Sequence, residues 1–149
     1  MTDRPRKAME RTAAGHPVVA PDRLELFIAT TLVSPNVREH YQAKATRTKR
    51  QREAVCLAVW AALHDPRGPG LRWRITDPAA PKVLTFTAHT ARRFDSHDNL
   101  RMACKPLVDG CIDAGLIRDD RDDAGHAFEY AQVQDGRRGV AIRVQLRNA

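Results

Sequence analysis

The stretch from Leu100 to Gly115 carries the pattern that most restricts the fold. Its apolar side chains recur three and four positions apart: Leu100, Ala103, Cys104, Leu107, Val108, Cys111 and Ile112. This spacing gathers them on one face of an α-helix, and Gly115 is a natural residue to end it. Asp98 or Asn99 is placed to cap the N-terminus of the helix. Because Pro106 removes a backbone hydrogen bond inside it, we expect the helix to break near that residue.

Stretches of alternating apolar and polar residues predict strands around this helix. The alternation is clearest at Leu24, Leu26 and Ile28, at Leu84, Phe86 and Ala88, and at Val140, Ile142, Val144 and Leu146. The strands expected are residues 23–32, 71–76, 83–90, 127–133 and 140–146. The last two flank Asp135 and Gly136, which predicts a C-terminal β-hairpin. With a second long helix over residues 37–64, we expect an α+β protein with a mixed sheet of about five strands and two main helices.

Length and composition place these elements in one domain. The chain has 149 residues, enough for a single well-buried core. We expect a flexible basic tail over residues 1–21 and one domain over residues 22–149. No apolar run approaches the roughly 18 residues that a membrane span needs, and no secretory signal is recognisable. The expectation is a cytoplasmic protein with reduced cysteines and no membrane partner.

The charge of the chain points to a polyanionic partner. Its net charge is +7 and its isoelectric point is near 9.9. The first half of the helix expected over residues 37–64 is basic, with no acidic residue from Gln42 to Gln51, whereas its second half is apolar enough to pack. The basic residues are Arg38, Lys44, Arg47, Lys49, Arg50 and Arg52. We expect them to contact DNA phosphates, with a solvated basic face as the alternative.

Eight aspartates and no glutamate lie within residues 94–123. Hydrolysis of a phosphodiester needs a hard cation, and magnesium is held by one or two carboxylates together with water. Asp95 and Asp98 follow a predicted strand and precede the helix, whereas Asp119 and Asp120 follow the helix after a short loop. These aspartates are therefore candidate metal ligands. The alternative is that they cap the helix and solvate a loop.

A series of these residues carries a family resemblance. It consists of Asp98-Asn99-Leu100, Lys105, Asp109 four residues later, and Asp119-Asp120 beyond an AGLI segment. The series resembles the RusA family of Holliday-junction resolvases, especially the forms common in phages. The resemblance extends over most of the chain, including Ser34-Pro35-Asn36 before the basic helix and Arg92-Arg93-Phe94-Asp95 after a strand.

The resemblance implies a small homodimeric endonuclease that cuts four-way or other branched DNA symmetrically with magnesium, in the cytosol of a bacterium or of a phage-infected host. The resemblance implies Asp98, Asp120 and Lys105 as catalytic residues, and we add Asp95 to them. The expected metal ligands are Asp95, Asp98, Asp119 and Asp120, with His97, Asn99 and Asp109 in support. Arg92 and Arg93 join the basic helix as expected DNA contacts.

The chain departs from the family pattern at Ser96, where the family usually has an acidic residue. We expect Asp95 to supply that carboxylate, with His97 as a hydrogen-bonding neighbour that would suit manganese better than magnesium. Two rival interpretations stay open because of this departure. One is a protein of the same fold that binds branched DNA without cutting it, and the other is an unrelated small basic nucleic-acid-binding protein.

Chain geometry adds a constraint on the expected metal site. A straight helix over residues 100–114 is about 22 Å long. Residues 115–120 extend over at most about 18 Å. A break at Pro106 would shorten the span and let Asp120 reach Asp98, and a contact across a dimer is the alternative.

Overall fold

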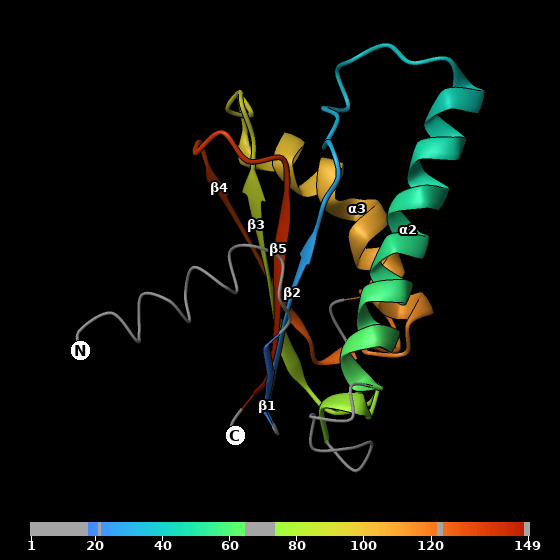
Figure 1. The fold of residues 1–149 in the computed structure, drawn as a ribbon, viewed down its shortest axis with the longest axis vertical. Helices are drawn as coiled ribbons and strands as arrows, with labels where there is room; N and C mark the ends of the chain where they lie inside the picture. Colours follow the sequence, from blue (N-terminus) through green and yellow to red (C-terminus); the bar gives the residue numbers. More distant parts are fainter. Residues whose placement is uncertain (1–17, 21, 65–73, 122–123, 148–149) are drawn as a thin grey trace.

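The computed structural model describes residues 18–20, 22–64, 74–121 and 124–147. Figure 1 shows these residues as a sheet flanked by two long helices. The elements are β1 (Val18–Ala20), β2 (Arg23–Ile28), α2 (Tyr41–Leu63), a 3-10 helix η1 (Arg74–Thr76), β3 (Lys82–His89), α3 (His97–Asp113), β4 (Ala127–Val133) and β5 (Gly139–Leu146). Within the described residues, this confirms the expected α+β fold with one mixed five-stranded sheet and two main helices.

The sheet has the strand order β1-β2-β5-β3-β4. Strand β5 is antiparallel to both β2 and β3, whereas β3 and β4 run parallel. The expected C-terminal hairpin is therefore wrong, because β3 lies between β4 and β5. The turn at Asp135 and Gly136 reverses the chain as expected, but both hydrogen-bonding edges of β5 are taken by β2 and β3.

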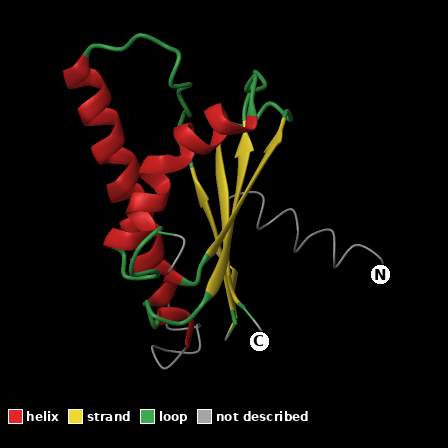
Figure 2. Cartoon of the chain, turned by 180° about the vertical axis from the view of Figure 1, so that it is seen from behind, coloured by secondary structure: helices red, strands yellow, loops and turns green. Residues whose placement is uncertain are grey.

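Both helices cover one face of the sheet, as Figure 2 shows. The inward-facing strand residues are buried, as the alternation predicts: Leu24, Leu26, Ile28, Leu84, Phe86, Ala88, Val140, Ile142, Val144 and Leu146. Val55 and Val59 of α2 and Leu107 of α3 belong to the same buried cluster. A single hydrophobic core therefore lies between the sheet and the helix layer.

The two helices approach each other closely at Gly110 of α3. A Cβ atom at this position would lie 2.7 Å from Val55 Cβ and 3.1 Å from the carbonyl oxygen of Arg52. Beside this contact, the guanidinium of Arg52 binds both carboxylate oxygens of Asp113, at 2.7 and 2.9 Å. The absence of a side chain at residue 110 and this bidentate ion pair fix how α2 lies on α3.

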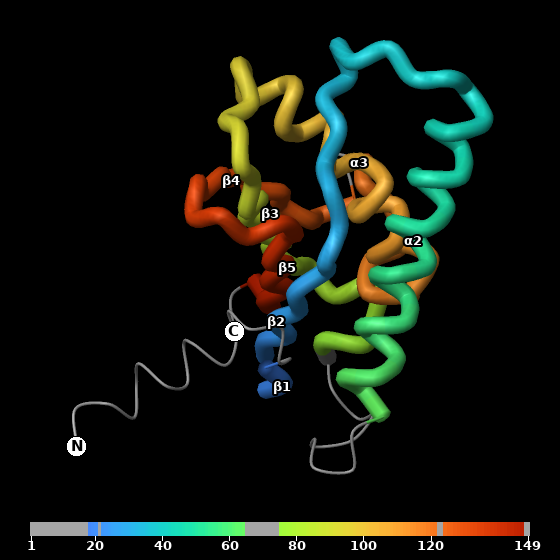
Figure 3. Tube along the Cα trace, turned by 45° about the horizontal axis from the view of Figure 1, so that its top comes forward, coloured from blue at the N-terminus to red at the C-terminus, as the bar shows by residue number. Residues whose placement is uncertain are grey.

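The N-terminal end of α2 lies away from the sheet (Figure 3). Residues 41–46 are exposed, and the first buried residue of the helix is Gln51. The Gln51 amide donates to Thr30 Oγ1 and to the Thr31 carbonyl, both at 3.2 Å. The expected division of this helix into an anchored half and a projecting basic half is confirmed. Among the described helices, none is both long and apolar enough to cross a membrane.

Local structure differs from expectation at three places. Residues 74–76 form η1 instead of part of a strand, and residues 71–73 lie outside the described residues. Residues 18–20, expected in the basic tail, form β1 and pair with β2, while residues 1–17 lie outside the described part. Helix α3 runs through Pro106 without interruption, so the expected break is wrong. The buried side chains on both sides of the proline hold the helix despite the missing backbone bond.

The three cysteines are free thiols, in agreement with the expected reduced state. Cys104 and Cys111 lie on α3 and are buried in the hydrophobic core. Burial raises the pKa of both thiols to about 12. These residues therefore act as small apolar packing groups.

Candidate functional site

Lys105 lies at the centre of a small charged cluster on α3. Its Nζ donates a hydrogen bond to Asp120 Oδ2 and lies 3.2 Å from Oδ1 of Asp109, one helical turn away. The side chain of Lys105 is 51% exposed. Burial acts to lower the pKa of Lys105, but hydrogen bonds to Asp120 and Asp109 outweigh it and raise the pKa. Lys105 is therefore a fixed ammonium between two carboxylates.

The approach of Asp120 to Lys105 depends on how α3 ends. Gly115 has a φ of 79°, in the left-handed region that glycine favours. The backbone N–H of Leu116 donates to the Cys111 carbonyl at 3.0 Å, as in a Schellman motif. The chain consequently turns back at once along the helix, and this return brings Asp120 beside Lys105.

The Asp119 carboxylate makes its contacts within its own turn. Its Oδ1 accepts hydrogen bonds from the backbone N–H groups of Asp120 at 2.7 Å and Arg121 at 3.2 Å, and its Oδ2 lies 2.8 Å from Arg121 Nε. Burial acts to raise the pKa of Asp119, but these hydrogen bonds and the Arg121 charge lower it overall. The contacts give Asp119 a structural role in shaping the loop that carries Asp120.

Ser96 caps α3. Its Oγ accepts a hydrogen bond from the backbone N–H of Asn99 at 3.1 Å, so the expected capping by Asp98 or Asn99 is wrong. Asp98 lies in the first turn with its side chain 83% exposed, and its Oδ1 is 3.9 Å from the Arg101 guanidinium. The Ser96 hydroxyl thus has a local structural role, and the Asp98 carboxylate is open to solvent.

Asp95 and His97 flank Ser96 at the entrance to α3. Both are exposed and both line a depression of about 540 Å³ beside β4. The His97 ring meets the Tyr130 ring edge-on, with centroids 5.9 Å apart. Within the described residues, no hydrogen bond joins His97 to Asp95, so the expected pairing of these neighbours is not formed.

The four expected metal ligands do not converge within one chain. Asp98 precedes Lys105 by seven residues, about 10 Å along the helix axis, whereas Asp120 lies at Lys105. The described residues include no group of three histidine, cysteine, aspartate or glutamate side chains that could hold a metal ion. Carboxylate oxygens suit magnesium, but this arrangement does not fit a three-carboxylate centre built by a single protomer.

A basic groove runs along the cluster, between α2, α3 and the β2–α2 loop. We call it the helix groove; it has a volume of about 620 Å³. Five basic side chains line it, against two carboxylates, Glu39 and Asp109: the basic residues are Arg38, Lys44, Arg47, Arg52 and Lys105. Its charge and length suit a phosphate backbone, in line with the expected DNA contacts.

Six of the basic residues expected to contact DNA lie on α2 or just before it, and they differ in their acidic partners. Arg47 donates to both Glu39 oxygens, at 2.7 and 3.2 Å, and Arg52 is bound to Asp113. These two arginines are held by acidic residues that lie outside the uninterrupted basic run of the sequence. Lys49 makes a long contact of 3.9 Å with Glu53. The remaining three, Arg38, Lys44 and Arg50, form no ion pair with another described residue and are free to bind phosphate.

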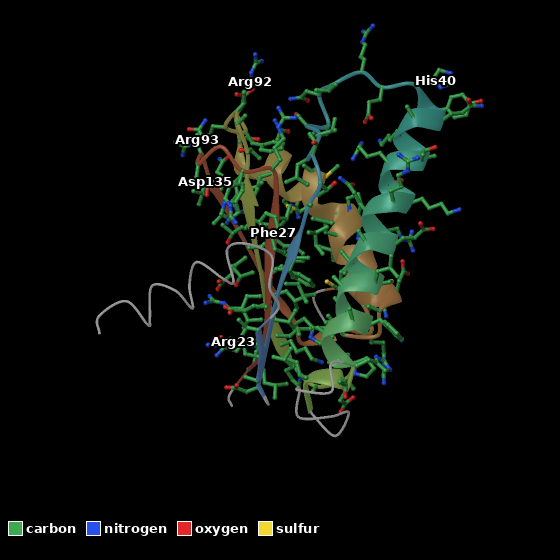
Figure 4. All side chains as sticks on the ribbon, in the orientation of Figure 1. Arg23, Phe27, His40, Arg92, Arg93 and Asp135 are labelled. Carbon is green, nitrogen blue, oxygen red and sulfur yellow. The ribbon has the colours of Figure 1, made fainter. Side chains whose placement is uncertain are left out.

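A second basic groove lies where the sheet ends above α3. We call it the sheet-end groove; it has a volume of about 720 Å³, and Arg92, Arg93 and Arg138 line it. Figure 4 shows Arg92 and Arg93 at the same end of the sheet as Asp135, with Arg23 at the opposite end. Arg138 was not among the expected DNA contacts. The Arg137-Arg138 pair after a predicted turn was the available signal, but its position beside Arg92 depends on the strand order.

No protein-family model matches this chain, and no curated protein is similar to it in sequence.

Proposed function

We propose that this protein is a magnesium-dependent, structure-selective endonuclease that cleaves Holliday junctions or related branched DNA. The observation that carries the proposal is the contact between Lys105 and Asp120. The two acidic segments that resemble the RusA family, Asp98 to Asp109 and Asp119-Asp120, are distant in sequence, but Asp109 of the first and Asp120 of the second meet at Lys105. They do so at the edge of a groove lined by basic residues.

In this proposal the basic residues of α2 hold the DNA backbone while the α3 cluster faces the scissile phosphate. Arg38 and Lys44 line the helix groove, and Arg50 lies on the same half of the helix. Lys105 supplies positive charge for a developing negative charge on the phosphate. Asp95, Asp98 and Asp120 do not converge within one protomer, so they would hold magnesium, or manganese as a substitute, only if carboxylates of two protomers came together. The proposed homodimer would allow carboxylates from two protomers to approach one phosphate.

A second candidate function is branched-DNA binding without cleavage. It is favoured by the position of the Lys105 ammonium between Asp109 and Asp120, where it already neutralises two carboxylates. It is also favoured by the dispersal of Asp98 and Asp120 along α3. A protein of this kind would protect or package branched DNA and would use the same grooves.

Cleavage of a labelled four-way junction tests the two candidates. The wild type is expected to cut in magnesium or manganese but not in EDTA, and Asp98→Asn and Asp120→Asn are expected to abolish cutting while junction binding persists. Asp22→Asn, at an exposed position before β2, is the matched control and is expected to cut normally. Full activity in Asp98→Asn or Asp120→Asn would contradict the mechanism. Binding in EDTA with no nicking in either metal would select the second candidate.

Competition by linear duplex separates both candidates from a general basic DNA-binding protein. Phosphate contacts alone carry no preference for branched DNA. We therefore expect a four-way junction to bind more tightly than a linear duplex of equal length at moderate salt. Equal affinities would favour the unrelated basic binding protein.

A further inference from the structure

We propose that the helix groove and the sheet-end groove bind two different arms of a branched DNA, and that residues 33–37 between them act as the divider that selects a branch point. This inference rests on the proposed DNA-binding function and adds how a branch is distinguished from a linear duplex. It concerns binding alone and does not depend on cleavage.

The divider is shared by the two grooves. Val33, Ser34 and Val37 of the β2–α2 loop line the helix groove on one side and the sheet-end groove on the other. Figure 3 shows this loop carrying the chain from the end of β2 across to α2. The loop is folded on itself, because the Ser34 carbonyl accepts a hydrogen bond from Val37 N at 3.1 Å and Ser34 Oγ accepts one from Asn36 N at 3.3 Å. A compact turn therefore separates two basic surfaces.

The outer part of the divider is apolar. Val37 is 55% exposed, and Pro35 is exposed beside it. Apolar side chains between basic grooves suit a place where DNA bases are unstacked, because a small apolar group can pack against an exposed base step. Such a place exists at a branch point and not within a continuous duplex.

The sheet-end groove is built to bind an anion. Arg92, Arg93 and Arg138 line it, with Asp95 as the one carboxylate, and these three arginines form no ion pair with another described residue. Arg138 is brought to the groove by the β4–β5 loop. That loop is tied to β3, because Asp135 accepts hydrogen bonds from His89 Nδ1 at 2.8 Å and from the backbone N–H of Arg137 at 3.2 Å.

The adjacent arginine is fixed in a different way. The guanidinium of Arg137 lies over the Phe27 ring of β2, 5.2 Å from the centroid. This contact joins the β4–β5 loop to a second strand of the sheet. Arg138, one of the three arginines of the sheet-end groove, is thus carried by a loop that β2 and β3 both hold in place.

Two grooves separated by the divider would favour a junction over a linear duplex, because two arms of one junction are connected to each other. A linear duplex can occupy one groove at a time, whereas two arms of one junction can occupy both. The second contact is then intramolecular and raises the affinity for the junction alone. The paired charges Arg47 and Arg52 hold the helix groove in shape, while Arg38 and Lys44, which also line it, are left to contact an arm.

Binding measurements in EDTA test this proposal. A fluorescent four-way junction and a linear duplex of the same length are titrated with the wild type, with Arg92→Ala/Arg138→Ala and with Arg38→Ala/Lys44→Ala. Removal of two arginines from the sheet-end groove is expected to weaken junction binding at least about tenfold and to leave duplex binding unchanged. The slope of log affinity against log salt for the junction should fall by about 2, because each arginine is expected to neutralise one phosphate. Arg38→Ala/Lys44→Ala is expected to weaken both complexes.

The matched control removes two exposed arginines elsewhere, in Arg118→Ala/Arg143→Ala, and should leave the ratio of the two affinities unchanged. Val37→Asp tests the divider itself and is expected to weaken junction binding without affecting the duplex. Equal losses of affinity for both DNAs in Arg92→Ala/Arg138→Ala, or no loss for either, would overturn the proposal, as would normal junction binding by Val37→Asp. Failure of the proposed endonuclease would show separately, as selective junction binding without cleavage in magnesium.

Discussion

Lys105 donates a hydrogen bond to Asp120, although 15 residues separate them in the chain. This contact marks how far the loop that carries Asp119 and Asp120, the acidic loop, returns along α3. Asp113, the last residue of the helix, is eight residues beyond Lys105, about 12 Å along the axis, which six residues can span. Asp98 lies a further 10 Å or so away. The uninterrupted helix therefore places the loop at Lys105 and leaves Asp98 out of its reach.

Replacing Lys105 with methionine is expected to abolish junction cleavage with little effect on stability. The side chain is half exposed, so the loss of its ion pairs should change the free energy of unfolding by less than about 1 kcal/mol. Cleavage rates and thermal unfolding of the variant give the two readouts. Arg143→Met removes an exposed basic side chain of β5 that lines neither groove, and it should behave as the wild type in cleavage. A cleaving Lys105→Met protein would leave Lys105 with a structural role only.

Substitutions at Ser96 should separate capping from chemistry. Ser96→Ala removes the hydrogen bond to Asn99 N and is expected to lower the free energy of unfolding by about 1 kcal/mol. Ser96→Asp keeps a side-chain acceptor at the cap and adds a carboxylate two residues before Asp98. If the chain uses the family's metal site, Ser96→Asp should retain wild-type stability and cleave faster in magnesium. Unchanged cleavage by Ser96→Asp would favour Asp95 as the carboxylate already in use, and Asp95→Asn should then be inactive.

Gly110→Ala is expected to separate α2 from α3 and to destabilise the protein by about 1 to 3 kcal/mol. The added methyl group would be 2.7 Å from Val55 Cβ, a distance that requires movement of one helix. Chemical denaturation of Gly110→Ala, Val55→Ala and the double variant provides the test. The double variant should lose less stability than the sum of the single losses, because truncation of Val55 makes room for the methyl group. Strictly additive losses would show that the two positions do not meet.

Lys82 should make stability depend on alkaline pH. The side chain is fully buried, with Nζ donating to the Asp77 and Ala80 carbonyls. Burial lowers the pKa of Lys82 to about 8 from its ordinary 10.5, against the opposing charge of Asp77. Between these two values the unfolded chain holds a proton that the folded chain has released, so the free energy of unfolding rises with pH. Lys82→Met should lack this rise.

Denaturation curves of the wild type and Lys82→Met between about pH 7.5 and 10 give the measurement. The difference between the two proteins removes the contributions of the cysteines and tyrosines, which are common to both. A difference of up to about 1.4 kcal/mol per pH unit is expected in the middle of this window. Parallel pH curves for the two proteins would contradict a lowered pKa at Lys82.

The interior of each main element could be read from local pattern. Leu24, Leu84 and Val140 lie on the buried faces of their strands because alternation depends only on neighbouring residues. The same reasoning placed Leu107 and Cys111 inward on α3. Element ends were less predictable. Ser96 takes the cap because its backbone is extended where the chain leaves β3, and Arg74 lies in a 3-10 helix.

The types of residue at the site could be predicted from the sequence, but the contacts between them could not. The charge run on α2 correctly indicated a projecting basic half, but it gave no sign that Arg47 would bind Glu39 or that Arg52 would bind Asp113. Those partners come from other segments, so no window of sequence contains the pair. Arg138 could not be predicted as a DNA contact for the same reason, because its position beside Arg92 follows from packing of the sheet.

The sequence by itself determined the main helices and strands and which of their residues face the core, because both follow from side chains a few positions apart. Tertiary structure alone decided that β5 lies between β2 and β3. Several strands distant in sequence could pair with β5, and the alternation within each strand does not indicate which of them will. Tertiary structure also decided that the acidic loop would stop at Lys105. Packing on both sides of Pro106 kept α3 whole, and an unbroken helix sets the distance between its two ends.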